Sequence, residues 1–94
     1  VEQLKGKPVY LSLDIDVLDP AFAPGTGTPE AGGLSSKELL QIISTVVPQL
    51  NVCGFDLVEV APNYDPSDRT IILAATLLRE LALATAETER RAKK

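Results

Sequence analysis

Apolar residues occupy every second position from Val9 to Ile15, and the positions between them are mostly polar. Such alternation predicts a strand, at about Pro8 to Asp14, because successive side chains of a strand point to opposite faces. Pro8 suits the first position of a strand, since proline has no amide hydrogen to donate. The pattern therefore places the carboxylates of Asp14 and Asp16 on the same side of the chain as the strand ends.

A helix and a second strand are expected next. Ser35 can cap a helix and form a capping box with Glu38, and apolar residues at helical spacing continue from there to Pro48. The second strand covers about Val52 to Glu59 and is apolar on both faces, as a parallel strand covered by helices on both sides would be. Asp56 interrupts this strand, and we expect a buried carboxylate paired with a backbone N–H or a basic side chain.

A second helix is expected after Asp65, with Asp65 as the N-cap, Pro66 at the first helical position and Asp68 near the positive end of the dipole. The spacing of its apolar residues predicts one buried face and a wider apolar stripe around it, which suggests burial on more than one side. The predicted face consists of Ile71, Ala74, Ala75, Leu78, Leu81 and Ala82, and the stripe is widened by Ile72, Leu73, Leu77 and Leu83.

The loop from Asp16 to Leu34 is long for a compact domain and is rich in glycine and proline. Proline restricts the backbone and glycine permits positive φ, whereas a flexible linker would contain more serine and charge. We therefore predict an ordered binding loop.

Composition excludes several classes of function. The net charge of −4 argues against a nucleic-acid partner, since the basic residues cluster only at the end, from Arg90 to Lys94. No apolar run is long enough to span a membrane, no secretory signal precedes the first strand, and a cytoplasmic location is the default. Cys53 is the only cysteine and is expected to be a buried small apolar residue. With no histidine, the chain has no imidazole to bind a metal or transfer a proton.

Two parallel strands with two helices do not complete a sheet, because the strand edges stay open. The chain also lacks an initiating methionine and enters a strand within a few residues. We therefore expect residues 1–94 to be a single partial domain, a fragment of a larger α/β protein. Studied alone, it should self-associate, as a homo-oligomer, or be partly disordered.

Acidic side chains follow both predicted strands. Asp14 and Asp16 end the first strand and Glu59 ends the second, and the carboxyl ends of parallel strands lie at the same edge of a sheet, where ligands bind. Thr26 and Thr28 are available from the loop. Clustered carboxylates repel one another unless a cation or a shared proton relieves the repulsion. The sequence therefore predicts a site for positive charge.

The segment SLDIDVLDPAFAPGTGTPEAGGLS resembles the motif of the ureohydrolases, the arginase and agmatinase family, and GFDLVEVAPNYD resembles the next characteristic segment of that family. The EVAP sequence is most similar to agmatinase. The resemblance implies the C-terminal β-α-β-α portion of a three-layer α/β/α arginase-like fold with parallel strands. It also implies an enzyme of polyamine biosynthesis that hydrolyses the linear amidine group of a cationic guanidino compound to urea and an amine.

The resemblance further implies a role for individual residues. Two Mn²⁺ ions would activate water for attack on the guanidinium carbon. Asp14 would bridge both ions and Asp16 would bind one of them, while Glu59 would bind the guanidinium group and Thr28 would line the substrate pocket. Asp19 is expected to be structural.

The family's other metal ligands and its proton-transfer histidine have no counterpart in this chain. We therefore expect no catalytic residue in the chain itself, weak manganese binding and no hydrolysis of agmatine by the chain alone.

Two alternatives remain. A phosphatase of the haloacid dehalogenase type also places two aspartates, as in Asp14 and Asp16, after an apolar strand, but it does not explain the long loop. A non-catalytic fragment used for assembly would explain the broad apolar stripe of the last helix.

Overall fold

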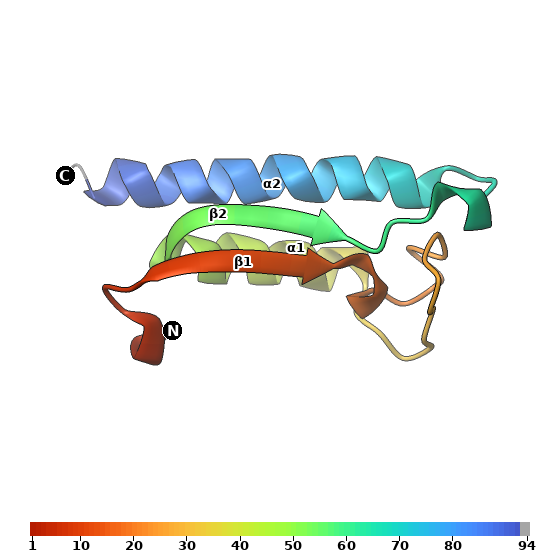
Figure 1. Ribbon diagram of the computed structural model, residues 1–94, viewed down its shortest axis with the longest axis horizontal. Coiled ribbons are helices and arrows are strands. Elements are labelled where there is room, and N and C mark those ends of the chain that lie inside the picture. The colour runs from red at the N-terminus through yellow and green to blue at the C-terminus, as the bar shows by residue number, and fades with distance from the viewer. Residues whose placement is uncertain (93–94) are drawn as a thin grey trace.

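The computed structural model describes residues 1–92, which fold as a β-α-β-α unit (Figure 1). Strands β1 (Pro8–Asp14) and β2 (Asn51–Val58) pair in parallel as a two-stranded sheet. Helix α1 (Ser36–Val46) connects them, and helix α2 (Arg69–Ala92) follows β2. The predicted first strand and the order of elements are confirmed. Lys93 and Lys94, at the end of the basic cluster, lie outside the described residues.

The pairing of the strands brings their carboxyl ends together. Leu11 pairs with Phe55 and Asp14 pairs with Val58, with one irregularity in register between Val9 and Tyr10. Both helices run opposite to the strands, so the carboxyl ends of the strands, the long loop and the N-terminal ends of the helices lie at the same end of the molecule (Figure 1). The candidate site residues Asp14, Asp16, Thr28 and Glu59 therefore all lie at this end of the molecule.

The core forms between the helices and one face of the sheet. Leu11 and Leu13 of β1 and Phe55 and Leu57 of β2 are partly buried against it. Its buried side chains come from the start of the long loop and from both helices, and they include Ile15, Leu18, Leu39, Ile43, Leu77 and Leu81.

The opposite face of the sheet carries exposed residues, which corrects the prediction for Cys53. We expected this thiol to be buried, but it is exposed, and Tyr10 is 61% exposed. The prediction assumed that helices cover both faces of the sheet. Among the described residues, both helices instead pack against the same face of the sheet. Strand β2 therefore has apolar residues on both faces, but only one of these faces is covered by the helices of this chain.

The prediction for Asp56 is also corrected. Its carboxylate is half-buried, and its partners are hydroxyl groups of β1 rather than a backbone N–H or a basic side chain. The Tyr10 hydroxyl donates to Oδ2 at 2.9 Å and the Ser12 hydroxyl donates to Oδ1 at 2.6 Å. The hydrogen bond that Tyr10 donates to Asp56 raises the pKa of the Tyr10 hydroxyl. These bonds link the two strands across the exposed face and support their register.

The capping box of α1 is present as predicted. The Ser35 hydroxyl accepts the amide hydrogen of Glu38, and the Glu38 carboxylate accepts that of Ser35. The pKa of Glu38 is lowered because its carboxylate accepts this backbone N–H. A 3-10 turn, Val47–Gln49, contains Pro48 and ends the helix.

Helix α2 begins three residues later than the sequence predicted. Pro66 was expected at the first helical position, but the helix starts at Arg69, and Asp68 has a φ of 62°. Asp65 nevertheless stabilises the start of the helix from a distance, because its carboxylate accepts the amide hydrogen and the hydroxyl of Thr70. The same carboxylate also accepts hydrogen bonds from the amide and the hydroxyl of Ser67.

The buried face of α2 differs from the predicted one. Ile71 and Leu78, both assigned to the core, are 40% and 41% exposed. Apolar residues surround this helix almost completely, so their spacing alone does not select a face. Contacts with α1, with the turn after it and with β2 select the face in the structure, and the buried residues are Thr70, Ala74, Leu77, Leu81 and Ala84. Within residues 1–92, neither helix combines the length and apolar content that crossing a membrane requires.

Replacing Ser35 by alanine tests the contribution of the capping box. We expect Ser35→Ala to lower the free energy of unfolding by about 1 kcal/mol, because the amide of Glu38 loses its acceptor. Lys37→Ala, on the exposed surface of the same helical turn, is the matched control. Urea unfolding followed by circular dichroism measures both, and equal stability of the two variants would contradict the expectation.

The exposed apolar surface predicts association of the chain with itself. Leu83 is 58% exposed on α2 and Tyr10 is 61% exposed on the sheet, while each strand has a neighbour on one side only. Sedimentation velocity should show a sedimentation coefficient that rises with concentration. Cys53→Ser controls for disulfide-linked dimers, and a monomer at all concentrations would refute this prediction.

Asp65 predicts a specific dependence of stability on pH. The Ser67 hydroxyl, and then that of Thr70, hold the pKa of Asp65 well below its usual value in the folded chain. The ionised carboxylate therefore stabilises the fold above about pH 3.9, the pKa in the unfolded chain, and this contribution is lost as the pH falls below that value. Unfolding curves across this range should show a flatter pH dependence for Asp65→Asn than for Asp68→Asn, its control. Parallel pH profiles for the two variants would show that Asp65 makes no such contribution.

Candidate functional site

The two aspartates at the end of β1 are held together by a turn. The strand ends at Asp14, and η2 (Ile15–Val17), a 3-10 turn, follows directly. Asp14 caps this turn, since its Oδ1 accepts the amide hydrogen of Asp16 at 3.0 Å. The alternation that the sequence suggested therefore stops at Asp14, and the hydrogen bond, rather than the strand, sets the relation between these residues. Both are half-buried.

The long loop returns to this turn. The Thr28 hydroxyl donates to Oδ2 of Asp16 at 3.1 Å, across 12 positions of the sequence. Thr28 itself is exposed. Asp16 and Thr28, which the sequence selected for separate reasons, are thus in direct contact.

The base of the loop is closed by backbone contacts, as the prediction of an ordered loop requires. Leu18 and Leu34 form a parallel bridge, and Asp19 accepts the amide hydrogens of Ala21 and Gly32 through its two carboxylate oxygens. The hydrogen bond from the amide of Ala21, and after it that from Gly32, lowers the pKa of Asp19. A side chain at Gly33 would lie 2.7 Å from backbone atoms of the opposite segment, so only glycine fits this crossing. The contacts of Asp19 agree with the structural role expected for it.

The middle of the loop is attached to the start of α2. Gly25 donates its amide hydrogen to Thr70 Oγ1 at 2.8 Å, and its carbonyl accepts the amide hydrogen of Ala61 at 2.7 Å. The next residue, Thr26, is only 2% exposed, and its hydroxyl has no hydrogen-bond partner among the described residues. The loop is therefore fixed at its middle as well as at its base.

Glu59 follows β2 directly and lies beside the end of β1 in the sheet, since Asp14 pairs with Val58. It is exposed and has a φ of 68°. A non-glycine residue in this left-handed region is uncommon and stores about 1–3 kcal/mol of backbone strain. Such strain is concentrated at functional sites, so the backbone supports the sequence's choice of Glu59.

The carboxylates do not form a metal site by themselves. Their hard oxygen atoms are of the type that Mn²⁺ prefers. Within residues 1–92, however, no three Asp, Glu or Cys side chains gather closely enough to hold an ion, and the sequence contains no histidine. The residues present therefore match the chemistry of a manganese site but fall short in number.

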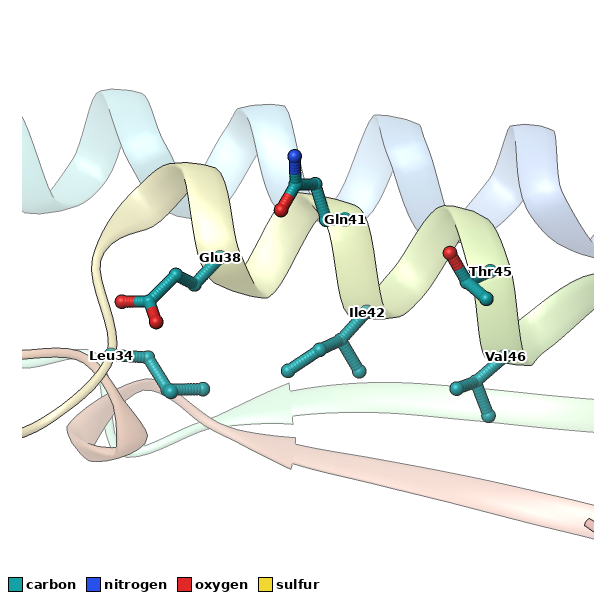
Figure 2. A pocket seen from close by; sticks show the side chains of 6 residues that line it. All are labelled: Leu34, Glu38, Gln41, Ile42, Thr45 and Val46. Carbon is teal, nitrogen blue, oxygen red and sulfur yellow. The ribbon is translucent and has the colours of Figure 1, made fainter.

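Two hollows lie near the site, and neither is lined by Asp14, Asp16, Thr28 or Glu59. A groove of about 360 Å³ runs along α1. Figure 2 shows that the side chains of Ile42 and Val46 lie on the same side of this helix as Leu34. Its only ionisable group, that of Glu38, is used by the capping box, so this groove offers no further ionisable side chain for catalysis. A second hollow of about 360 Å³ lies on the long loop and is lined by Pro24, Thr26, Gly27, Pro29 and Tyr64.

Sequence reasoning missed the hydrogen bonds by which Thr70 and Asp65 link the long loop to the start of α2. Asp65 was identified only as a helix cap, and Thr70 was not selected at all. The one available signal was Gly25, since a glycine between Pro24 and Thr26 marks a place where another backbone or side chain approaches closely. The sequence does not reveal that the approaching residue is 45 positions away.

Comparison with known proteins relates this geometry to a family. Residues 1–84 match the model of the arginase family. The chain is 61% identical over 82 residues to the agmatinase of Halalkalibacterium halodurans, covering 86% of this chain and 28% of that protein. It is also 57% identical over 83 residues to the mitochondrial guanidino acid hydrolase of Homo sapiens, covering 88% of this chain and 23% of that protein.

The fold agrees with a solved structure. The proclavaminate amidino hydrolase of Streptomyces clavuligerus superimposes with a TM-score of 0.87 and 49% identity, over 93% of this chain and 29% of that one. The chain thus spans less than a third of the length of the relatives that it matches. The expected arginase-like fold with parallel strands is confirmed, and the chain belongs to the arginase family.

Proposed function

We propose that this chain supplies part of the active site of a ureohydrolase, which cleaves a guanidino compound to urea and an amine. The observation that carries the proposal is the contact between Asp16 and Thr28 at the carboxyl end of the sheet. It joins a carboxylate suited to metal binding to a loop that resembles the family's substrate loop. Every relative named above is a hydrolase of an amidino or guanidino compound, or agmatinase, and none is a phosphatase.

In this proposal the carboxylates of Asp14 and Asp16 would contribute ligands to a pair of manganese ions. Asp14 uses Oδ1 and Asp16 uses Oδ2 in the hydrogen bonds described, so each has a second carboxylate oxygen to offer. The remaining ligands and the proton-transfer group come from another part of a complete ureohydrolase. A manganese pair there supplies Lewis-acid chemistry, and no catalytic step is assigned to this chain alone.

Glu59 and Thr28 bind the substrate. A carboxylate holds a planar guanidinium group through paired, charge-assisted hydrogen bonds, the geometry that joins arginine to acidic residues. The exposed carboxylate of Glu59 is available for such a contact. Thr28, held at the edge of the same site by Asp16, lines the pocket in which the guanidinium group lies.

Agmatine is the first candidate substrate. The EVAP sequence after β2 is similar to agmatinase, and the H. halodurans protein is named for this activity. The human relative makes a guanidino acid the second candidate. The two candidates differ at the end of the substrate away from the guanidinium group, where a guanidino acid carries a carboxylate. Contacts to that end would come from parts of a complete ureohydrolase outside this chain, so the chain's own residues do not choose between the two.

The isolated 94-residue chain should not release urea from agmatine, with or without added Mn²⁺, because it lacks the number of ligands that a metal pair requires. A colorimetric urea assay on the purified chain, beside the complete H. halodurans agmatinase, measures this. Robust turnover by the chain alone would refute the proposal that its site is incomplete.

A chimera places the chain in the setting of its family. Replacing the matched 82 residues of the H. halodurans agmatinase with those of this chain should give an enzyme that hydrolyses agmatine. Asp16→Asn in the chimera should lower kcat/KM by more than about 100-fold, since even the outer partners of a metal site are worth roughly 10–100-fold.

Glu59→Gln in the same chimera should chiefly weaken substrate binding, because it removes the charge that pairs with guanidinium while preserving the shape of the side chain. Glu30→Gln is the matched control, since Glu30 is an exposed loop carboxylate with no assigned role. If Asp16→Asn and Glu59→Gln behave like Glu30→Gln, the assignment of these two residues is wrong.

A further inference from the structure

The loop that carries Thr28 is attached to a helix far away in the sequence. Both peptide groups of Gly25 take part: its amide hydrogen goes to Thr70 Oγ1 at 2.8 Å, and its carbonyl accepts from the amide of Ala61 at 2.7 Å. Thr70 is completely buried at the start of α2. The middle of the loop is therefore bonded to the start of the helix, in addition to the contacts that the loop makes at its own two ends.

Asp65 determines how the hydroxyl of Thr70 is oriented. A carboxylate only accepts hydrogen bonds, so the Thr70 hydroxyl must point its hydrogen at Asp65 Oδ2, 2.6 Å away. The Thr70 oxygen is then left to accept the amide hydrogen of Gly25. Asp65 is 2% exposed, and its other oxygen is occupied by the amide and the hydroxyl of Ser67. The direction of each bond in this chain of contacts is thus fixed.

The approach is close enough to require glycine. A Cβ atom at position 25 would lie 2.9 Å from both Cβ and Oγ1 of Thr70 and 3.1 Å from Cβ of Asp65. Three residues further along, Thr28 donates to Asp16. The segment from Gly25 to Thr28 is therefore held at both ends, with the buried Thr26 between them.

We propose that Asp65 and Thr70 are positioning residues of the site: by fixing Gly25, they hold Thr28 against Asp16. The anchor itself follows from the contacts above, whereas its importance for a reaction rests on the proposed function. Neither residue touches the substrate in this account. Both act through the backbone of the loop.

The rival explanation is that these residues only stabilise the start of α2. Two substitutions separate the explanations. Thr70→Val removes the hydroxyl that Gly25 uses but retains the amide of residue 70, which Asp65 accepts, and both contacts of Ser67. Thr70→Ser retains the hydroxyl and serves as the conservative counterpart.

Amide hydrogen exchange on the full 94-residue chain tests the anchor. Thr70→Val should speed exchange at Gly25 by about tenfold, because one buried hydrogen bond is lost locally. The amides of α1 should be unaffected, and Thr70→Ser should resemble the unsubstituted chain. An equal effect on Gly25 and α1, or no difference between the valine and serine variants, would overturn the proposal.

Kinetics of the chimera test the role in the site. Thr70→Val should lower kcat/KM for agmatine by about tenfold through loss of one positioning contact, with manganese content and melting temperature close to those of Thr70→Ser. Asp68→Asn, a nearby carboxylate outside the anchor, should leave activity unchanged. If exchange at Gly25 rises while kcat/KM stays the same, the positioning role is rejected. If the unsubstituted chimera is inactive, the proposed function fails, and the exchange experiment still decides whether the anchor exists.

Discussion

The parallel pairing of β1 with β2 is the constraint on which the rest of the structure depends. It places the end of one strand beside the end of the other, with Asp14 opposite Val58 and Glu59 one residue further on. The hydroxyls of Tyr10 and Ser12 reinforce this register through Asp56. Because both helices run back along the sheet, their N-terminal ends and the long loop are gathered at the same edge (Figure 1). Without this pairing the acidic residues and the loop would have no common place.

The loop converts this edge into a site by returning to it. Asp19 closes its base, the anchor at Gly25 fixes its middle, and Thr28 then reaches Asp16. A loop of this length would lose much conformational entropy if it were ordered by the ligand alone. The hydrogen bonds that the chain makes within itself reduce that cost, because they already hold the loop in place.

Much of this arrangement was predictable from the sequence because it depends on local rules. Alternation gave the bounds of β1, and the capping box located the start of α1. The buried face of α2 was not predictable, because apolar residues surround the helix and contacts with α1, the turn after it and β2 select the face. The start of α2 was missed because Asp65 caps it from four residues upstream. Cys53 was misplaced because its burial depends on what covers the second face of the sheet.

The site shows the same division between local and distant information. The choice of Asp14, Asp16, Thr28 and Glu59 came from strand ends and from resemblance to a family, and the structure brings Asp16 and Thr28 into contact. The contribution of Thr70 depends on a contact across 45 positions, which no local pattern contains. The number of carboxylates is also instructive, since too few of them converge among residues 1–92 to hold an ion. The acidic edge therefore offers carboxylates of the right type but not a complete set of ligands.

The central claim is that Asp14 and Asp16 bind metal in a complete ureohydrolase. Anomalous X-ray scattering at the manganese edge, from crystals of the agmatinase chimera grown with Mn²⁺, measures this directly. Our account predicts two anomalous peaks, with Asp14 within coordination distance of both and Asp16 within coordination distance of one. Manganese peaks that lie away from both carboxylates in an active enzyme would contradict it.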